Sequence, residues 1–533
     1  MATAPTSGLA GVTHEVTNQP PPLEPYNVFE ADAPMREALE REGGGWGAGR
    51  LRDTGELAGS PEAVEHSARC ERNDPVLRTH DRYGNRVDEV DLDPSWHWLL
   101  REAIEREIHS LPWRDPQLGA HTVRAALMYT WSQVNAGVMC PVSMTHAVIP
   151  SLRENPEAAA EWEPRLTSSD YATGALAGMA MTEKQGGSDV RANTTHAEPS
   201  ADDTWEITGH KWFCSYPPCD VFLTLAQSSQ GLSCFLIEGS DPGFGVQRLK
   251  DKLGTRSLPS SEVEFRGVRG RLVGEEGRGV ATIVRMVNHT RLDCLIGSAA
   301  GMRWGTVAAT HHARHRTAFG AKLVDQPAMA NVLADLAIES EAATATAMRI
   351  ARAYDEDGAA FRRLATAVSK YWVCKRAPGH AAEALECLGG NGYVEESGLP
   401  RLLRDSPLNS IWEGSGNVAA LDVLRAMGKD PEGLPAFLHE VEQAQGGDQR
   451  LDAHVAKLKD SLGALGEDVQ WRARRLVEDL GLALQGSLLV RNAPPAVADA
   501  FCASRLGGDA GHAYGTLPAG VDAAAIASRV LPD

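Results

Sequence analysis

Residues 409–417 read NSIWEGSGN and place a single carboxylate, Glu413, between a run of small polar residues and two large apolar side chains, Ile411 and Trp412, which are expected to form an apolar wall beside it. Apolar surroundings raise the pKa of a carboxyl group toward the range of a general base, because desolvation disfavours the charged form. The glycines at 414 and 416 would let the backbone come close to a ligand. Alone, this stretch equally fits a loop with one solvated glutamate, so its meaning depends on the rest of the chain.

The bulk properties indicate a multidomain globular protein. A chain of 533 residues is too long for one hydrophobic core, and three or four domains are expected. There is no run of eighteen apolar residues and no basic, apolar leader at the N-terminus, so we expect neither a membrane span nor a signal peptide. Nine scattered cysteines without a CxxC pair favour reduced thiols and a cytoplasmic location.

The hydrophobic pattern predicts an α+β fold that is mainly α. We expect a flexible or extended arm over residues 1–26, a helical domain over 27–175, an antiparallel β-domain over 176–275, a four-helix bundle over 276–430 and an extra helical domain over 434–533. Long helices are predicted at 281–315, 328–355, 364–388 and 417–427. Short apolar runs predict strands at 205–207, 221–225, 234–237, 246–249 and 263–265, because turn residues separate them.

A second motif opens the expected β-domain, where residues 181–189 read MTEKQGGSD. A Gly-Gly-Ser turn flanked by hydroxyl side chains can present hydrogen-bond donors to a phosphate or to the edge of a heteroaromatic ring. It is not the dinucleotide fingerprint, because no GxGxxG joins a strand to a helix here. As a free-standing glycine-rich loop it is weak evidence for a cofactor site.

Together, several motifs in a fixed order resemble the acyl-CoA dehydrogenase superfamily of flavoproteins, in its AidB-like (adaptive response, isovaleryl-CoA dehydrogenase-like) branch. The resemblance extends from about Val16 into the C-terminal domain. It is carried by MTEKQGGSD (181–189), GHKWF (209–213), LSCF (232–235), LKDKLG (249–254), TR (290–291), RTAFG (316–320), LGGNGY (388–393) and NSIWEGSGN (409–417).

The resemblance implies an FAD-dependent oxidoreductase in which Glu413 is the catalytic base and Arg291 lies near it. The base takes the α-proton of an acyl thioester while the β-hydrogen leaves as hydride to the flavin. It also implies a set of FAD-binding residues: Met181, Thr182, Ser188, Phe213 (where many relatives have a stacking Trp), Ser215, Gly389, Gly390, Trp412, Ser415 and Asn417. Arg316 and Phe319 match residues that reach the FAD of a neighbouring subunit, which implies a homotetramer built as a dimer of dimers.

Several of these site residues also have a plain structural interpretation. Arg316 fits a charge on a helix surface, Gly389 and Gly390 fit a helix C-cap, Phe213 fits the core of a strand and Arg291 fits a helix-stabilising residue. The three histidines at 311, 312 and 315 lack a cysteine or carboxylate partner motif, so no metal site is predicted.

The substrate is less well defined than the family. Asn288 stands where many acyl-CoA dehydrogenases have an Asp that helps to hold the pantetheine arm, so the acyl carrier stays open between CoA, a carrier protein and neither. The leading interpretation is α,β-dehydrogenation of a short acyl thioester or a similarly activated acyl compound. A flavin oxidase or monooxygenase of specialised metabolism is one alternative.

Binding of double-stranded DNA, with protection against alkylation, is the other alternative, because AidB-like proteins are associated with DNA through a basic C-terminal domain. The formal charge of the chain is −19, and residues 440–533 carry nine basic against thirteen acidic residues. Lys and Arg supply most of the non-specific affinity for DNA. Only Arg472, Arg474 and Arg475 cluster, so the composition of this tail does not support DNA binding.

Overall fold

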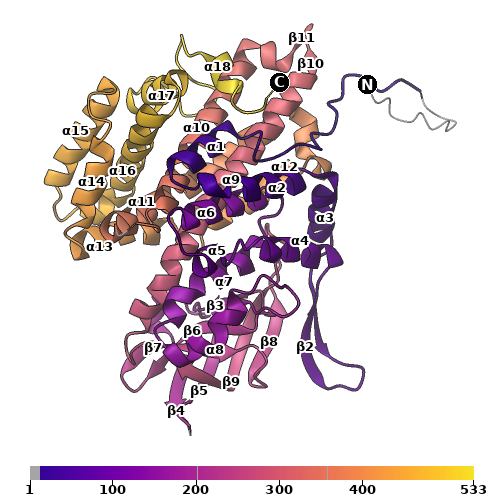
Figure 1. Ribbon diagram of the computed structural model, residues 1–533, viewed down its shortest axis with the longest axis vertical. Coiled ribbons are helices and arrows are strands. Elements are labelled where there is room, and N and C mark those ends of the chain that lie inside the picture. The colour runs from indigo at the N-terminus through magenta and orange to yellow at the C-terminus, as the bar shows by residue number, and fades with distance from the viewer. Residues whose placement is uncertain (1–12, 201, 357, 533) are drawn as a thin grey trace.

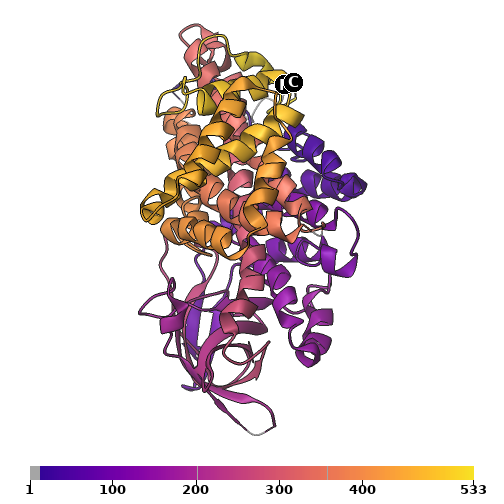
Figure 2. The same cartoon turned by 90° about the vertical axis from the view of Figure 1, so that its left-hand side faces the viewer.

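The computed structural model describes residues 13–200, 202–356 and 358–532, and the prediction for residues 1–12 therefore lies outside it. A β-rich region occupies one end of the molecule together with a few helices, and most of the helices fill the rest (Figure 1). The N-terminal helices cover one side of a long central helix, and the C-terminal helices lie on the outside of the bundle that surrounds it (Figures 1 and 2). The expected α+β, mainly helical fold is confirmed.

The N-terminal region is helical, as predicted, and contains one unpredicted β-hairpin. Asp32 caps the first helix, since its carboxylate accepts a hydrogen bond from the backbone N–H of Met35 at 3.0 Å. Asp81 likewise accepts from the backbone of Tyr83 and Asn85 and closes the hairpin turn. The elements are α1 (Ala33–Arg41), α2 (Ala48–Ala58), α3 (Pro61–Arg72), β1 (Val76–His80), β2 (Arg86–Asp91), α4 (Pro94–Glu105), α5 (Leu111–Arg114), α6 (Ala120–Ser132), α7 (Met139–Leu152) and α8 (Pro156–Leu166).

The middle region forms a seven-stranded sheet in the order β3-β6-β4-β5-β9-β7, with β8 paired to β9. All five predicted strands fall within its members. The expectation of a purely antiparallel sheet is wrong in two pairings, because β6 runs parallel to β3 and to β4. The strands are β3 (Ala177–Ala180), β4 (His196–Pro199), β5 (Trp205–Ser215), β6 (Val221–Ser228), β7 (Gly231–Glu238), β8 (Phe244–Leu249) and β9 (Ser260–Leu272).

A bundle of long helices follows, and the four predicted helices are confirmed as α9 (Gly279–His315), α10 (Pro327–Arg352), α11 (Ala359–Glu386) and α13 (Gly416–Lys429). The 37-residue α9 packs against α10, α11, α6 and α7, and so joins the bundle to the N-terminal region. A short hairpin of β10 (Thr317–Ala318) and β11 (Ala321–Lys322) follows α9, and α12 (Leu399–Asp405) follows α11. None of the described helices is long and apolar enough to cross a lipid bilayer.

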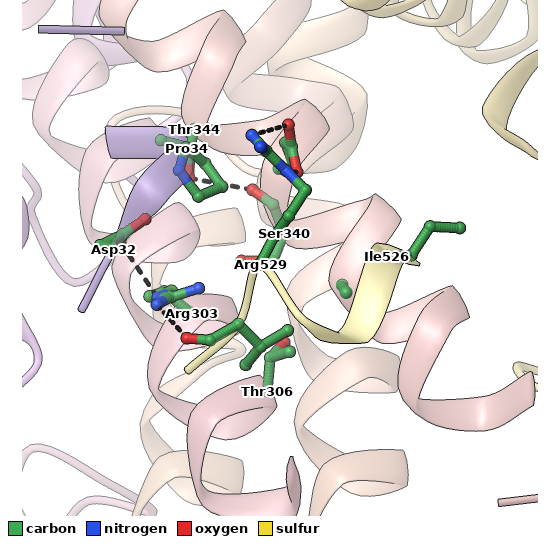
Figure 3. Close-up of a pocket in the computed structure, with 11 residues that line it drawn as sticks. Asp32, Pro34, Arg303, Thr306, Ser340, Thr344, Ile526 and Arg529 are labelled. Atoms are coloured by element: carbon green, nitrogen blue, oxygen red, sulfur yellow. Dashed lines mark hydrogen bonds and ion pairs between the residues drawn. The ribbon is translucent and has the colours of Figure 1, made fainter. Parts of the chain in front are cut away.

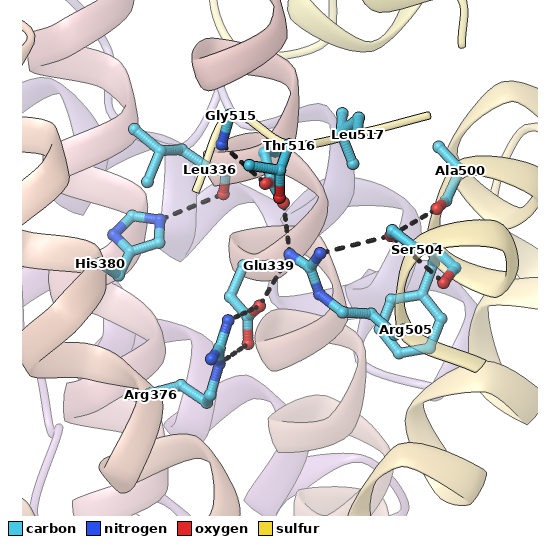
Figure 4. Close-up of polar contacts among 12 residues, drawn as sticks. Leu336, Glu339, Arg376, His380, Ala500, Ser504, Arg505, Gly515, Thr516 and Leu517 are labelled. Atoms are coloured by element: carbon cyan, nitrogen blue, oxygen red, sulfur yellow. Dashed lines mark hydrogen bonds and ion pairs between the residues drawn. The ribbon is translucent and has the colours of Figure 1, made fainter. Parts of the chain in front are cut away.

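The C-terminal helices dock on the bundle through buried ion pairs. They are α14 (Gly433–Glu442), α15 (Gln449–Gly463), α16 (Val469–Asn492), α17 (Pro495–Phe501) and α18 (Ala523–Ala527). Arg505, which follows α17, pairs with Asp335 and, at 3.1 Å, with Glu339 of α10 (Figure 4). Arg376 of α11 holds the same Glu339 at 2.9 Å. Buried charges need such partners, and these pairs therefore fix where the C-terminal region sits.

The end of the chain returns to the first helix. Arg303 of α9 pairs with Asp32 at 3.1 Å and donates to the backbone carbonyl of Val530 at 2.6 Å (Figure 3). Arg529 bridges Glu37 of α1 and Glu341 of α10. Asp32 and Glu37 at the first helix and Arg529 and Val530 near the last described residues are thus tied to the bundle, and one large hydrophobic core with two smaller clusters connects these regions.

Candidate active site

The loop that carries Glu413 is strained and firmly anchored. Glu413 has φ of 56°, a left-handed conformation that is costly for a residue with a side chain and that clusters at functional sites. Buried Lys370 donates to the backbone carbonyls on either side, of Trp412 at 2.8 Å and of Gly414 at 2.6 Å. Arg291 donates to the carbonyl of Glu413 itself at 2.9 Å. Three charge-assisted hydrogen bonds therefore hold the loop in this conformation.

The carboxyl group of Glu413 is poised to take up a proton. Its Oε2 atom is buried and has no hydrogen-bond partner. Desolvation raises the pKa of Glu413 above its ordinary value, against the opposing effects of the Thr290 hydroxyl and the charges of Arg291 and Lys370. An unpartnered carboxyl oxygen with a raised pKa is the arrangement that a general base requires.

Arg291 acts on the backbone of the loop. Its second bond, at 2.6 Å, goes to Asp422 of α13, which Arg363 also contacts at 2.8 Å. The described contacts of Arg291 thus lie at the loop backbone and at Asp422, and its catalytic role stays a prediction. Lys370 and Asp422 were not predicted from the sequence. A lysine inside an apolar helical stripe, as at Lys370, was the signal that could have found the first of them.

The apolar wall around Glu413 differs from the expected one. Ile411 is 58% exposed, whereas Trp412 is partly buried and its indole N–H donates to Asn409 at 3.0 Å. Two buried thiols lie near the carboxyl group instead. Burial raises the pKa of Cys140 to about 12, with a smaller contribution from the charge of Glu413, and the same charge acts on Cys294. All nine cysteines of the chain are buried free thiols.

The MTEKQGGSD loop is anchored by a fully buried ion pair. Lys211 of β5 contacts Glu183 at 2.9 Å, and Glu183 also accepts from the backbone N–H groups of Thr194 and Thr195. Next to it, the carbonyl of Thr182 accepts from the N–H of Trp212 at 2.7 Å. The backbone of Met181 and Thr182 is thus fixed beside β5, while Ser188 lies exposed at the end of the loop.

Phe213 does not belong to the core of the sheet. Its ring is 48% exposed although its neighbour Cys214 is fully buried, and Lys250 Nζ lies 4.7 Å from the ring centroid. Ser215, two residues on, is partly exposed on the same strand and interacts with the thiol of Cys140. An aromatic face and a hydroxyl therefore stand on one strand, on the side where Glu413 approaches Cys140.

These features fit an FAD ring. The available groups are an aromatic face at Phe213, hydroxyls at Thr182 and Ser215 and an anchored glycine-rich loop. A Cβ added at Gly186 would meet no atom within 4 Å, so space is open beside the loop. The unpartnered Oε2 of Glu413 lies on a neighbouring element.

A second group of expected cofactor residues lies at the other end of α9. Arg316 and Arg291 are separated by 25 residues of helix, on the order of 37 Å at 1.5 Å per residue. Arg316 donates to the carbonyl of Asn18 at 2.6 Å, and Asn391 donates to Gln19 at 3.0 Å. The start of the β10–β11 hairpin and the turn at residues 389–393 therefore both contact the segment around residues 18–19. This segment is far from α13 (Figure 1).

Phe319 and the glycine pair leave this second group open to solvent. Phe319 is 99% exposed and has φ of 53°. A Cβ added at Gly389 or Gly390 would meet no atom within 4 Å, so neither glycine is required by packing inside this chain. Because of its distance from Glu413, the group cannot contribute to the same site within one chain.

The residues after Glu413 face the C-terminal region. Ser415 and Asn417 are exposed at the start of α13, and the Asn417 side chain accepts from Arg474 of α16 at 2.8 Å. The other two arginines of that cluster pair along their own helix end, Arg472 with Asp468 and Arg475 with Asp479. Each arginine thus already has an acceptor within the chain.

Comparison with known families matches the chain in three consecutive parts. Residues 18–173 match the adaptive response protein AidB N-terminal domain. Residues 178–268 match the acyl-CoA dehydrogenase middle domain, and residues 277–428 match the acyl-CoA dehydrogenase C-terminal domain.

Individual relatives agree with this division. The chain is 40% identical over 510 residues to the putative acyl-CoA dehydrogenase AidB of Escherichia coli, covering 92% of this chain and 94% of the relative. It is 33% identical over 455 residues to acyl-CoA dehydrogenase family member 11 of Caenorhabditis elegans, covering 79% and 73%. A crystal structure of Caenorhabditis elegans ACDH-11, in complex with C11-CoA, superposes with a TM-score of 0.86 at 28% identity and covers 95% of this chain and 94% of that one. The chain belongs to the acyl-CoA dehydrogenase family of FAD-dependent oxidoreductases, in its AidB-like branch.

Proposed function

We propose that the protein catalyses the α,β-dehydrogenation of an acyl thioester, with Glu413 as the base and FAD as the hydride acceptor. The observation that carries this proposal is the buried, unpartnered Oε2 of Glu413 on a strained loop that three charge-assisted hydrogen bonds hold in place. Such strain persists only where the surrounding structure enforces it, and it is typical of catalytic residues.

In the proposed reaction, different residues of the chain bind the cofactor, accept the proton and hold the loop in position. FAD, when bound, supplies the N5 atom that accepts the hydride. Met181, Thr182, Ser188, Phe213 and Ser215 would hold its ring and pyrophosphate, with Trp412 beside the ring. Ser415 and Asn417 would contact its adenosine side, and Arg474 orients Asn417. Glu413 takes the α-proton onto its carboxylate, while Lys370 and Arg291 keep the loop from moving as the charge is lost.

CoA is the carrier we favour. The Caenorhabditis elegans relative binds C11-CoA and shares the fold over 95% of this chain. That ligand is longer than the short acyl group that the sequence suggested, and both lengths therefore belong in the test. Asn288, at the position that differs from many acyl-CoA dehydrogenases, has its backbone carbonyl engaged by the Tyr354 hydroxyl at 2.8 Å.

Anaerobic titration of the FAD-loaded protein tests the proposal. Isovaleryl-CoA, butyryl-CoA and C11-CoA are added separately while the oxidised flavin band is recorded. Bleaching by at least one of them is the expected result, and the most effective one gives the chain length. A fully flavinated protein that none of a complete chain-length series bleaches would overturn the proposal.

The raised pKa of Glu413 predicts a pH dependence. The base must be ionised to accept a proton, so activity is lost as the pH falls through the pKa of Glu413 and is retained above it. Because burial raises that pKa, we expect the acidic limb of the kcat/KM profile to lie above the ordinary glutamate value of about 4.3. Initial rates between about pH 4 and 9 locate the limb. A limb at or below the ordinary glutamate value would contradict the assignment.

We also propose that the protein assembles as a homotetramer. At the far end of α9, Phe319 is 99% exposed, and Tyr393 and Val394 are 80% and 49% exposed. Arg316, Gly389 and Gly390 lie at the same end and have no cofactor role within their own chain. A partner subunit would both cover the apolar side chains and bring its own FAD to these residues. Light scattering on the FAD-loaded protein should give about four times the chain mass of 57.2 kDa, and a monomer would overturn this proposal.

A further inference from the structure

Three histidines from three different helices meet between the N-terminal region and the bundle. They are His121 of α6, His146 of α7 and His289 of α9, and one ring nitrogen of each lies within 4.8 Å of the other two. Their ring centroids are 5.3–5.8 Å apart. None of them takes part in the proposed active site, although His289 precedes Thr290 in the chain.

The hydrogen bonds of these rings leave their nitrogens available. His146 Nδ1 lies 3.1 Å from the backbone carbonyl of His109. A carbonyl can only accept, so Nδ1 carries the proton and Nε2 presents its lone pair. A backbone carbonyl that orients an imidazole in this way is the usual support of a metal-bound histidine. The ring of His121 makes no hydrogen bond within the described part of the chain.

A second observation points to a missing ligand. His289 is only 8% exposed, and its Nδ1 atom is buried without any hydrogen-bond partner among the described residues. Leaving a buried polar atom unpaired costs about 1–3 kcal/mol. The ring of the neighbouring Trp113 packs against all three imidazoles, with ring centroids 5.0–5.6 Å apart. It cannot satisfy the nitrogen, because its own indole N–H already donates to the carbonyl of His146.

Two guanidinium groups and two carboxylates lie around the three rings. Burial and the positive charge of Arg124 both lower the pKa of all three imidazoles. The guanidinium of Arg124 makes two hydrogen bonds to the carboxylate of the buried Asp293. Arg362 is a second cation whose charge further lowers the pKa of His121. The carboxylate of Asp355 accepts from the backbone N–H of His121 at 2.9 Å. A divalent cation at the histidines would therefore face two carboxylates together with these two guanidinium groups.

We propose that His121, His146 and His289 bind a zinc-class divalent cation through three imidazole nitrogens. Imidazole ligands suit Zn²⁺, which takes them at about 2.0–2.1 Å and accepts a water in a fourth position. Nitrogens bound at that length are about 3.4 Å apart in a tetrahedron, so small side-chain rotations would bring these three together. The cation would clamp α6 and α7 onto α9. No metal site was predicted from the sequence, because these residues are far apart in the chain.

Metal analysis of the untagged, FAD-loaded protein tests this proposal. The protein is equilibrated with zinc sulfate, desalted and analysed by plasma mass spectrometry. We expect about one zinc per chain, and zinc should raise the Tm. The variant His121→Gln/His289→Gln should lose the zinc and the rise in Tm. His311→Gln/His315→Gln is the matched control, because it removes the other adjacent pair of histidines, whose rings are 4.4 Å apart, and it should keep both.

The outcomes separate the explanations. Zinc below about one fifth of an equivalent in the wild-type protein would overturn the proposal, as would equal zinc in the His121→Gln/His289→Gln variant. Loss of zinc in the control alone would assign it to adventitious surface binding. If the double variant does not fold, the single variant His121→Gln, at a partly exposed ring, serves instead. Cobalt substitution gives an independent readout, since three-nitrogen tetrahedral Co²⁺ should show visible ligand-field bands that this variant loses.

Discussion

Glu413→Gln is expected to retain FAD and to lose its reduction by acyl-CoA. The substitution keeps the size and the polarity of the side chain, and Lys370 and Arg291 bind this loop only through its backbone carbonyls, so the cofactor site should be unchanged. An amide cannot accept the α-proton. General-base catalysis contributes roughly 10²–10⁴-fold to rate, and we expect a loss of flavin reduction of at least that size.

Stopped-flow measurement of flavin bleaching under anaerobic conditions gives the rate directly. Glu395→Gln is a suitable control, because that residue pairs with Arg404 on the surface and should leave the rate unchanged. A Glu413→Gln variant that holds FAD and is reduced within a few-fold of the wild-type rate would remove Glu413 from the mechanism. The proposal of a zinc site would be unaffected, since it is measured by metal content.

The sequence predicted what local patterns encode. Helical periodicity located α9, α10, α11 and α13, and alternating apolar runs located five strands. The hairpin of β1 and β2 was missed, because it is short, charged and mostly exposed and therefore carries little hydrophobic signal. The parallel pairing of β6 was missed for another reason. It depends on where the chain returns after β5, and that is set by packing rather than by any residue pattern.

In the candidate site, too, local motifs were predicted from the sequence and contacts from distant parts of the chain were not. The motifs pointed to Glu413, the 181–189 loop and the aromatic position at 213, because each sits in a contiguous stretch. The groups that hold them come from elsewhere in the chain: Lys370 lies 43 residues before Glu413, and Asp422 reaches Arg291 from another helix. Ile411, which was expected to form part of an apolar wall beside Glu413, is exposed, because the neighbours of an irregular loop cannot be read from its own sequence.

Lys211→Met is expected to destabilise the protein and weaken FAD binding together. The ion pair of Lys211 with Glu183 has no exposed surface, and removing one partner of such a pair costs about 3–5 kcal/mol because the other charge is left uncompensated. Glu183 anchors the loop that carries Met181 and Thr182, so its displacement should also disturb the FAD ring site. Urea denaturation of the apoprotein measures the first effect, and FAD titration measures the second.

The double variant Lys211→Met/Glu183→Gln separates charge from packing. If the buried charge is what destabilises Lys211→Met, the double variant should recover part of the loss, because no ion is left unpaired. Burial raises the pKa of Glu183, but the Lys211 charge and the bonds from Thr194 and Thr195 outweigh it and lower the pKa to about 2. The stability that Glu183 contributes is therefore present above its unfolded pKa of about 4.3 and is lost as the pH falls toward 2. The double variant should lack this component of acid sensitivity. Equal destabilisation in both variants would mean that shape, and not charge, holds the flavin loop in place.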